Sequence, residues 1–221
     1  PPIHGAAVVG QAIKESQIIN ESFACRYINL STSRSIDEIG KNPIKKAGRY
    51  IALLLKVFVA LIRFRPQLCY ITLTAKGAGF YKDALVVFLV KLLGVKRVYH
   101  FHNKGVSIRQ HKRFDNAMYR CVFRRAHIIL LSKYLYPDIQ KYMPEDRVHF
   151  CLNGMQDQSN SFQKKDSSLN QIVEFLFLSN LIESKGVFYL LDACKMLHNK
   201  GIQFKCTLAG GDGNLTMQEV T

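Results

Sequence analysis

The sequence has few cysteines, and their arrangement predicts neither a metal site nor a set of disulfides. Its six cysteines are scattered over 221 residues, without a CxxC motif or a Cys/His cluster at metal-ligand spacing. These absences argue against a zinc module and against a disulfide-stapled scaffold. Because most of the cysteines stand in apolar segments, we expect them to be reduced and buried, as in a cytosolic protein.

Long apolar runs are also missing. The longest, Tyr50 to Ile62, is interrupted by Lys56 and falls short of the ~20 residues needed to cross a bilayer. A transmembrane segment is therefore not expected, and no signal peptide is visible. The chain starts at Pro1 and stops soon after a glycine-rich turn, so we expect both ends to be cut from a longer protein.

Acidic residues are scarce. Sixteen Asp and Glu stand against 31 Lys and Arg, which gives a formal net charge of +15. This excess favours an anionic partner, but charge alone does not choose between a membrane surface, a nucleotide and a nucleic acid. The hydrophobic content of 48% is ordinary for a globular protein with a buried core.

The dominant pattern is an alternation of short β-branched runs with longer stretches of helical period. Strands are expected at Ala24 to Leu30, Gln67 to Leu73, Arg97 to Phe101, Ala126 to Leu131, Arg147 to Leu152, Val173 to Leu178 and Phe204 to Leu208. Helices are expected at Gly5 to Asn20, Ile44 to Phe64, Gly79 to Leu93, Arg113 to Arg125, Lys133 to Tyr142 and Lys185 to Asn199. Repeated βα units of this kind predict an α/β fold with a doubly wound parallel sheet.

One long polar segment, Gly154 to Asn170, breaks this rhythm and is the best boundary between domains. We predict a Rossmann-like N-terminal domain over 1–154 that lacks its first strand, and a linker over 155–171. Residues 172–221 are then the beginning of a second Rossmann-like domain. No repeat of solenoid length is found.

Polar residues and glycines stand where strands give way to helices. His4 and Gly5 open the first expected helix, where free backbone N–H groups meet phosphates, although a plain Pro/Gly turn also explains them. His100, His102 and Asn103 stand at the end of an expected strand, the edge at which open α/β sheets bind ligands. His102 at the tip is the better site candidate, whereas His100 fits a core residue equally well.

A second group of candidates follows the linker. Lys185 precedes a helix N-terminus, where a lysine is unfavourable unless an anion lies between the two. The alternative is a solvated loop lysine. Gly210, Gly211 and Gly213 directly follow an expected strand, and they permit either close backbone approach to a ligand or merely a tight turn.

The order of these motifs resembles that of the GT-B glycosyltransferases, and within them the retaining group 1 family, often called family 4. The matching segments are Pro2 to Ala6, His100 to His102, Ile129 to Ser132, Cys151 to Met155, Ser179 to Gly186 and Leu208 to Gly213. The resemblance covers nearly the whole chain and is most specific from Ser179 to Gly186.

The resemblance implies a hexosyltransferase that moves a sugar from a nucleotide-sugar, such as a UDP- or GDP-sugar, to a glycan or lipid-linked acceptor. The sugar would be transferred with retention, without a metal or cofactor, in surface polysaccharide or glycolipid assembly. His102 would lie near the transferred sugar, and Lys185 would neutralise the donor diphosphate. The remaining matched positions divide into a donor side, with Gly5, Asn180, Gly210, Gly211 and Gly213, and an acceptor side or cleft, with His4, His100, Asn103 and Asn153.

Two departures from the family pattern follow from the same comparison. The family has arginine where this chain has Asn180, which removes one positive charge from the diphosphate site. The paired glutamates of the family would lie downstream of Thr221, so we expect the fragment alone to be inactive. A family member that has lost transfer activity is an alternative interpretation, for which Asn180 is the only hint.

The expected helix over Ile44 to Phe64 is rich in basic residues, with Lys45, Lys46 and Arg49 near its start. One interpretation is a core helix with a solvated basic rim. The other places its basic end on an anionic bilayer, at the cytoplasmic face of the cell membrane, where each Lys or Arg contributes about 1 kcal/mol.

A rival to the enzyme is a basic Rossmann-like module that binds anionic lipid or nucleic acid without chemistry. A nucleic-acid binder interleaves basic residues with exposed aromatics. Here the aromatics Phe58, Phe64, Phe88 and Tyr99 stand in apolar segments, so a nucleic-acid partner is not expected.

Overall fold

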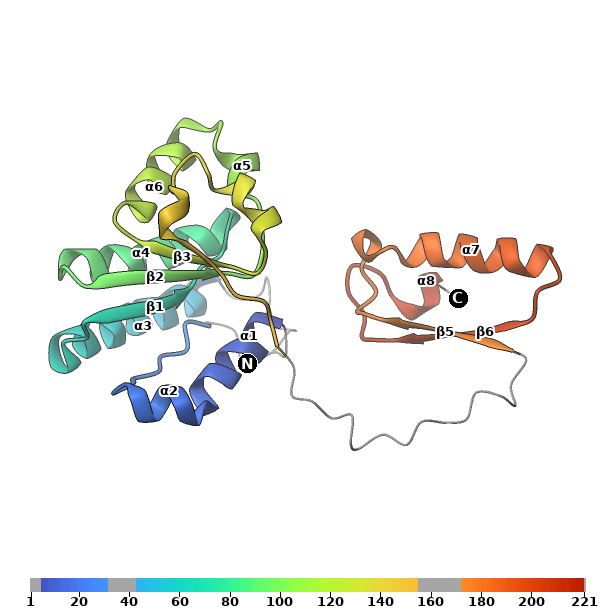
Figure 1. Ribbon diagram of the computed structural model, residues 1–221, viewed down its shortest axis with the longest axis horizontal. Coiled ribbons are helices and arrows are strands. Elements are labelled where there is room, and N and C mark those ends of the chain that lie inside the picture. Colours follow the sequence, from blue (N-terminus) through green and yellow to red (C-terminus); the bar gives the residue numbers. More distant parts are fainter. Residues whose placement is uncertain (1–4, 32–42, 155–171, 221) are drawn as a thin grey trace. The chain divides into compact units, whose positions relative to one another are not determined.

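The computed structural model describes residues 5–31, 43–154 and 172–220 of the chain (Figure 1). The chain divides into two compact units, residues 1–155 (unit 1) and 156–221 (unit 2). Each unit is described by itself below.

Unit 1 is built on a parallel sheet of four strands with helices between them (Figure 1). The strands, in the order β1-β2-β3-β4 across the sheet, are β1 (Leu68–Thr72), β2 (Lys96–Phe101), β3 (His127–Leu130) and β4 (Val148–Phe150). The helices are α1 (Gly5–Glu15), α2 (Gln17–Ser22), α3 (Pro43–Phe64), α4 (Gly77–Leu92), α5 (Val106–Arg109) and α6 (Arg113–Phe123). The predicted α/β class with a parallel sheet is confirmed for this unit.

One face of the sheet supplies the core of unit 1. Successive side chains of a strand point to opposite faces, so alternate residues share a face. The buried residues on this face are Ile71, Leu73, Tyr99, Phe101, Ile128, Leu130 and Val148. They belong to one hydrophobic cluster with residues of α3, α4 and α6. Helix α4 contacts both α3 and α6, so the three helices form one layer.

The opposite face is more exposed. Tyr70, His127 and His149 lie on it and are exposed, whereas His100 on the same face is buried. The register explains this grouping, because His100 pairs with Ile129 and Ile129 pairs with His149 across three neighbouring strands. Polar and titratable side chains therefore gather on the face that does not carry the main core.

Three secondary-structure predictions are wrong. Residues 24–31 form no strand, and the helix predicted over Gly5 to Asn20 is two helices, because Ser16 caps the second with its side chain. The helix predicted over Lys133 to Tyr142 is a 3₁₀ helix, Lys133–Asp138, that contains Pro137. Proline removes an N–H donor and shortens such helices.

The predicted burial of the cysteines is also wrong: none of the six is fully buried, and Cys69, Cys194 and Cys206 are half-buried. Cys25, Cys121 and Cys151 are exposed. Phe58 and Phe64, which stand in an apolar segment of the sequence, are 36% and 40% exposed. Their exposure weakens the argument from aromatic placement against a nucleic-acid partner.

Unit 2 contains two parallel strands, β5 (Val173–Leu178) and β6 (Phe204–Ala209). Between them come a 3₁₀ helix (Glu183–Lys185) and α7 (Val187–Asn199), and α8 (Met217–Val220) follows β6. Its buried cluster consists of Leu181, Val187 and Val220, with partly buried neighbours. This cluster is small, and Leu176 and Leu178 of β5 remain 64% and 77% exposed.

Among the described helices, none has the length and apolar character required to cross a membrane.

Candidate functional site

The carboxyl ends of β1 and β2 are tied together by polar contacts. Oδ1 of Asn103, two residues beyond β2, accepts a hydrogen bond from the backbone N–H of Ala75 at 3.0 Å. The buried hydroxyl of Tyr119 on α6 donates to the carbonyl of Ala75 at 2.7 Å. Both backbone groups of Ala75 are therefore satisfied, and Asn103 helps to fix the edge of the sheet.

Strand β2 and its continuation bring His100 and His102 together. Their ring centroids are 4.1 Å apart, and the Tyr70 hydroxyl lies 2.5 Å from Nδ1 of His100. His100 is only 4% exposed. Burial, with a smaller contribution from His102, lowers the pKa of His100 to about 4. His100 is therefore neutral at pH 7.

The Tyr70 hydroxyl also holds the ring of His100 in place. Desolvation of the hydroxyl raises the pKa of Tyr70 to about 12, so the phenol keeps its proton and forms one hydrogen bond with Nδ1 of His100. His100 is thus a buried, oriented neighbour of His102. His102, one residue beyond the strand, is half-buried as a residue, and both of its ring nitrogens are buried.

A carboxylate of the protein occupies the backbone loop that follows His102. Oδ2 of Asp138 accepts from the N–H groups of Gly105 at 2.8 Å and Val106 at 3.1 Å, and Oδ1 accepts from the N–H and hydroxyl of Ser107. Burial raises the pKa of Asp138, but these hydrogen bonds together outweigh burial and lower it. These N–H groups therefore bind Asp138 rather than an external phosphate.

In unit 2, two of the predicted donor-binding glycines allow one loop to pack on another. A Cβ at Gly210 would lie 1.9 Å from the carbonyl oxygen of Ser179, and one at Gly213 would lie 2.5 Å from that of Leu181. The Leu181 N–H donates to the carbonyl of Gly211 at 2.9 Å. Backbone contact between the loops after β5 and β6 explains Gly210 and Gly213 without a ligand.

Asn180 and Lys185 lie on the loop between β5 and α7. The exposed Asn180 accepts a hydrogen bond from the N–H of Gly211 at 3.3 Å through Oδ1. Lys185 ends the 3₁₀ helix and is exposed, and Gly186 (φ 86°) caps α7. The first turn of α7 contains no acidic residue. A lysine and a helix N-terminus thus place two positive features at one loop, as an anion site requires.

The other predicted residues are not gathered with these. His4 lies outside the described residues, and Gly5 is the first residue of α1. Asn153 lies in exposed, irregular chain after β4. The three basic residues predicted to face a membrane, Lys45, Lys46 and Arg49, all fall in the first two turns of α3.

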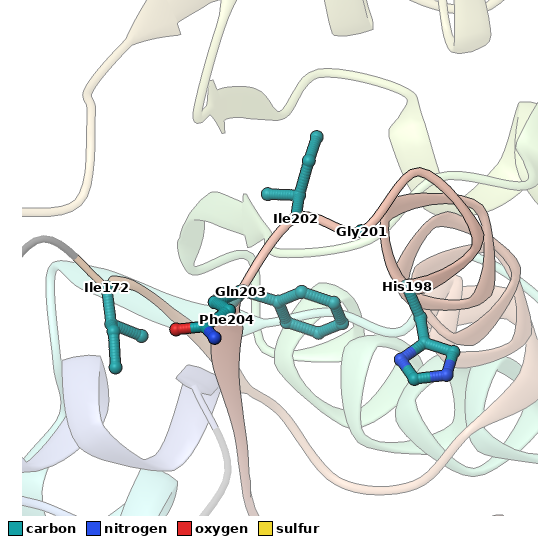
Figure 2. Close-up of a pocket in the computed structure, with 6 residues that line it drawn as sticks. All are labelled: Ile172, His198, Gly201, Ile202, Gln203 and Phe204. Atoms are coloured by element: carbon teal, nitrogen blue, oxygen red, sulfur yellow. The ribbon is translucent and has the colours of Figure 1, made fainter.

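Unit 2 also has a pocket away from these loops. Figure 2 shows its lining residues: Ile172, His198, Gly201, Ile202, Gln203 and Phe204. They lie before β5, at the end of α7 and in the connection to β6. Because Val173 pairs with Phe204, this is the amino edge of the two strands. The pocket therefore contains none of the predicted site residues.

Two residues that contact this part of unit 1 were not among the site residues predicted from the sequence. No sequence pattern marks Tyr70 as a site residue, because it stands in the middle of an expected strand. Only the pairing of β1 with β2 brings its hydroxyl to His100. Asp138 was expected inside a helix. Its role became visible only when the 3₁₀ helix placed it beside Gly105, 33 residues away in sequence.

Within the described ranges, no three or more His, Cys, Asp or Glu side chains are grouped so that they could hold a metal ion. In comparisons with known proteins, no family model matches the chain, and no curated protein matches it significantly.

Proposed function

We propose that the chain binds the substrates of a sugar-nucleotide-dependent, retaining glycosyltransferase of the GT-B type, of which it forms part. The observation that carries the proposal is the contact between His100 and His102 at the carboxyl end of a parallel strand. In α/β sheets, ligands bind at this end. Neutral, buried His100 packs against His102 and so holds the His102 ring in one place at this end of the sheet.

In the proposed reaction, the bond between the anomeric carbon and the β-phosphate oxygen breaks, and its electron pair leaves with the nucleoside diphosphate. An acceptor hydroxyl forms the new bond on the same face of the sugar and passes its proton to the departing phosphate oxygen. Lys185 and the N-terminus of α7 would stabilise the negative charge of the leaving diphosphate. Asn180 is uncharged, so Lys185 is the cationic side chain that we assign to this role.

We assign α3 to the acceptor side, as the surface that contacts an anionic bilayer. Ile51, Leu55 and Ile62 recur at helical spacing and are 60%, 60% and 47% exposed. Arg49, Lys56 and Arg63 recur every seven residues and so share one face of the helix. An exposed apolar stripe beside a basic stripe is the pattern of a helix that lies in a membrane interface.

The transfer proposal is tested by measuring nucleoside diphosphate release from UDP-, GDP- and ADP-sugars, with membrane extract as acceptor. The assay uses the 221-residue chain and any longer reading frame that contains it. Lys185→Ala and His102→Ala are each expected to slow release at least tenfold, which corresponds to about 1.4 kcal/mol of transition-state stabilisation. Lys200→Ala and His111→Ala are the matched controls, because both remove an exposed side chain of the same type elsewhere.

Donor-specific release that falls in the two test variants and not in the controls supports the enzyme. Because the 221-residue chain alone is expected to be inactive, the contradicting result is folded protein of the longer reading frame that releases no nucleotide from any donor. If that protein still binds anionic vesicles, the basic non-catalytic module is the function that remains.

A further inference from the structure

A second pair of histidines lies on the exposed face of the sheet in unit 1, away from the carboxyl edge. His127 begins β3, and His149 is the middle residue of β4. Their rings are stacked at an interplanar angle of 15°, and Nδ1 of His127 lies 3.2 Å from Nε2 of His149. Both side chains are exposed. Two imidazole nitrogens thus face each other in contact with solvent.

The spacing of these nitrogens fits two ligands of one transition-metal ion. Zinc and similar ions bind imidazole nitrogen at about 2.0–2.1 Å, which places two tetrahedral ligand atoms roughly 3.3 Å apart and two octahedral neighbours roughly 2.9 Å apart. The observed 3.2 Å lies between these values. A hydrogen bond between the rings places one proton between the nitrogens, and a metal ion that binds both nitrogens would replace that proton.

The backbone already holds the two histidines in this position. β3 and β4 are hydrogen-bonded neighbours, with Ile129 paired to His149, so the two rings need little ordering before they bind. The sequence does not predict the pair, because 22 residues separate its members and no short motif contains both. Among the described residues no third His, Cys, Asp or Glu completes the set, so water would fill the remaining metal positions.

We propose that His127 and His149 form a two-imidazole site for a divalent first-row transition metal such as Ni²⁺ or Zn²⁺. The bound ion joins β4, a strand of three residues, to β3 and stiffens the chain that continues into Cys151 and Asn153. The site is independent of the proposed transfer reaction, because it uses neither His102 nor Lys185. Imidazole suits these metals better than it suits Mg²⁺ or Ca²⁺, which prefer oxygen ligands.

The test is calorimetric titration of the reduced 221-residue chain with Ni²⁺, repeated with Zn²⁺ and with Mg²⁺. The expected result is one Ni²⁺ per chain and no Mg²⁺ binding. His127→Asn and His149→Asn are each expected to weaken Ni²⁺ binding at least tenfold, and the double variant is expected to bind little more weakly than either. This non-additivity distinguishes one shared ion from two separate sites.

Two controls separate the pair from other ligands. Cys151→Ser removes the exposed thiol two residues from His149, and His198→Asn removes an exposed histidine of unit 2; both are expected to bind Ni²⁺ as the wild type does. In the NMR spectrum, paramagnetic Ni²⁺ is expected to broaden the ring protons of His127 and His149 first. Unchanged affinity in both single His variants, or loss of binding in Cys151→Ser, would overturn the proposal. His→Gln versions repeat the test if an Asn variant fails to fold.

Discussion

At the scale of single residues, His100 gives unit 1 a stability that depends on pH. Its pKa is about 4 in the folded protein, because burial and then His102 lower it, and about 6.5 in an unfolded chain. Between these values the unfolded state binds the proton and the folded state does not. The free energy of unfolding is therefore expected to fall as pH drops from about 6.5 towards 4, by at most about 3 kcal/mol, and to be level above that range.

The measurement is urea unfolding at half-unit pH steps from 4.0 to 7.5, for the wild type and His100→Gln. Glutamine keeps an acceptor for the Tyr70 hydroxyl but does not titrate. The variant is expected to lose part of the slope below pH 6.5. Identical slopes in the two proteins would show that His100 titrates normally.

Only some of the contacts at this edge of the sheet could be predicted from the sequence. Alternation along β2 was enough to predict that His100 and His102 share a face, because strand geometry is local. The role of Asn103 was not predictable, because its partner is the backbone of Ala75, which lies in the connection after β1. Gly210 and Gly213 likewise look like ligand-binding glycines until the loop that they contact is placed beside them.

At the scale of elements, α3 is expected to carry the membrane contact. Lys56 and Arg63 are exposed and lie on its basic face. Reversing both charges, in Lys56→Glu/Arg63→Glu, is expected to weaken binding to phosphatidylglycerol-containing vesicles by about 30-fold or more, since each basic residue contributes about 1 kcal/mol. Vesicle cosedimentation at several salt concentrations measures this effect.

The matched control is Lys195→Glu/Lys200→Glu, which makes the same change in net charge on exposed residues of unit 2. It is expected to retain most of the binding. Leu55→Glu tests the apolar stripe separately, because it removes insertion and leaves the basic residues in place. Equal loss in the two charge-reversal variants would mean that net charge, rather than α3, attracts the protein to the lipid.

Helices and strands were predicted correctly where one hydrophobic period continues through the segment and no single residue interrupts it. The apolar period of α3 and the β-branched runs of β1 to β3 are of this kind, and the structure contains all of them. The prediction failed where one side chain redirected the backbone. Ser16 starts a new helix with its hydroxyl, and Pro137 limits a helix to 3₁₀ form. A single residue of this kind is missed when the hydrophobic period is averaged over a whole segment.

At the scale of the whole molecule, the two units have separate hydrophobic clusters of very different size. A small cluster stabilises its strands less, so backbone amides of β5, β6 and α7 are expected to exchange hydrogen faster than those of β1 to β3. Leu181→Ala removes a side chain that is 1% exposed and is expected to cost about 2–5 kcal/mol, enough to abolish protection in unit 2. Protection of β1 to β3 is expected to stay as in the wild type.

Hydrogen exchange followed by mass spectrometry resolves these segments, and Ile128→Ala is the reciprocal variant, because Ile128 is fully buried in the cluster of unit 1. It is expected to lower protection in β1 to β3 by a similar free energy and to leave β5 and β6 unchanged. If either substitution lowers protection in both units equally, the chain unfolds as one cooperative body. Independent loss would mean instead that the two carboxyl edges, with His102 on one unit and Lys185 on the other, belong to separately stable structures.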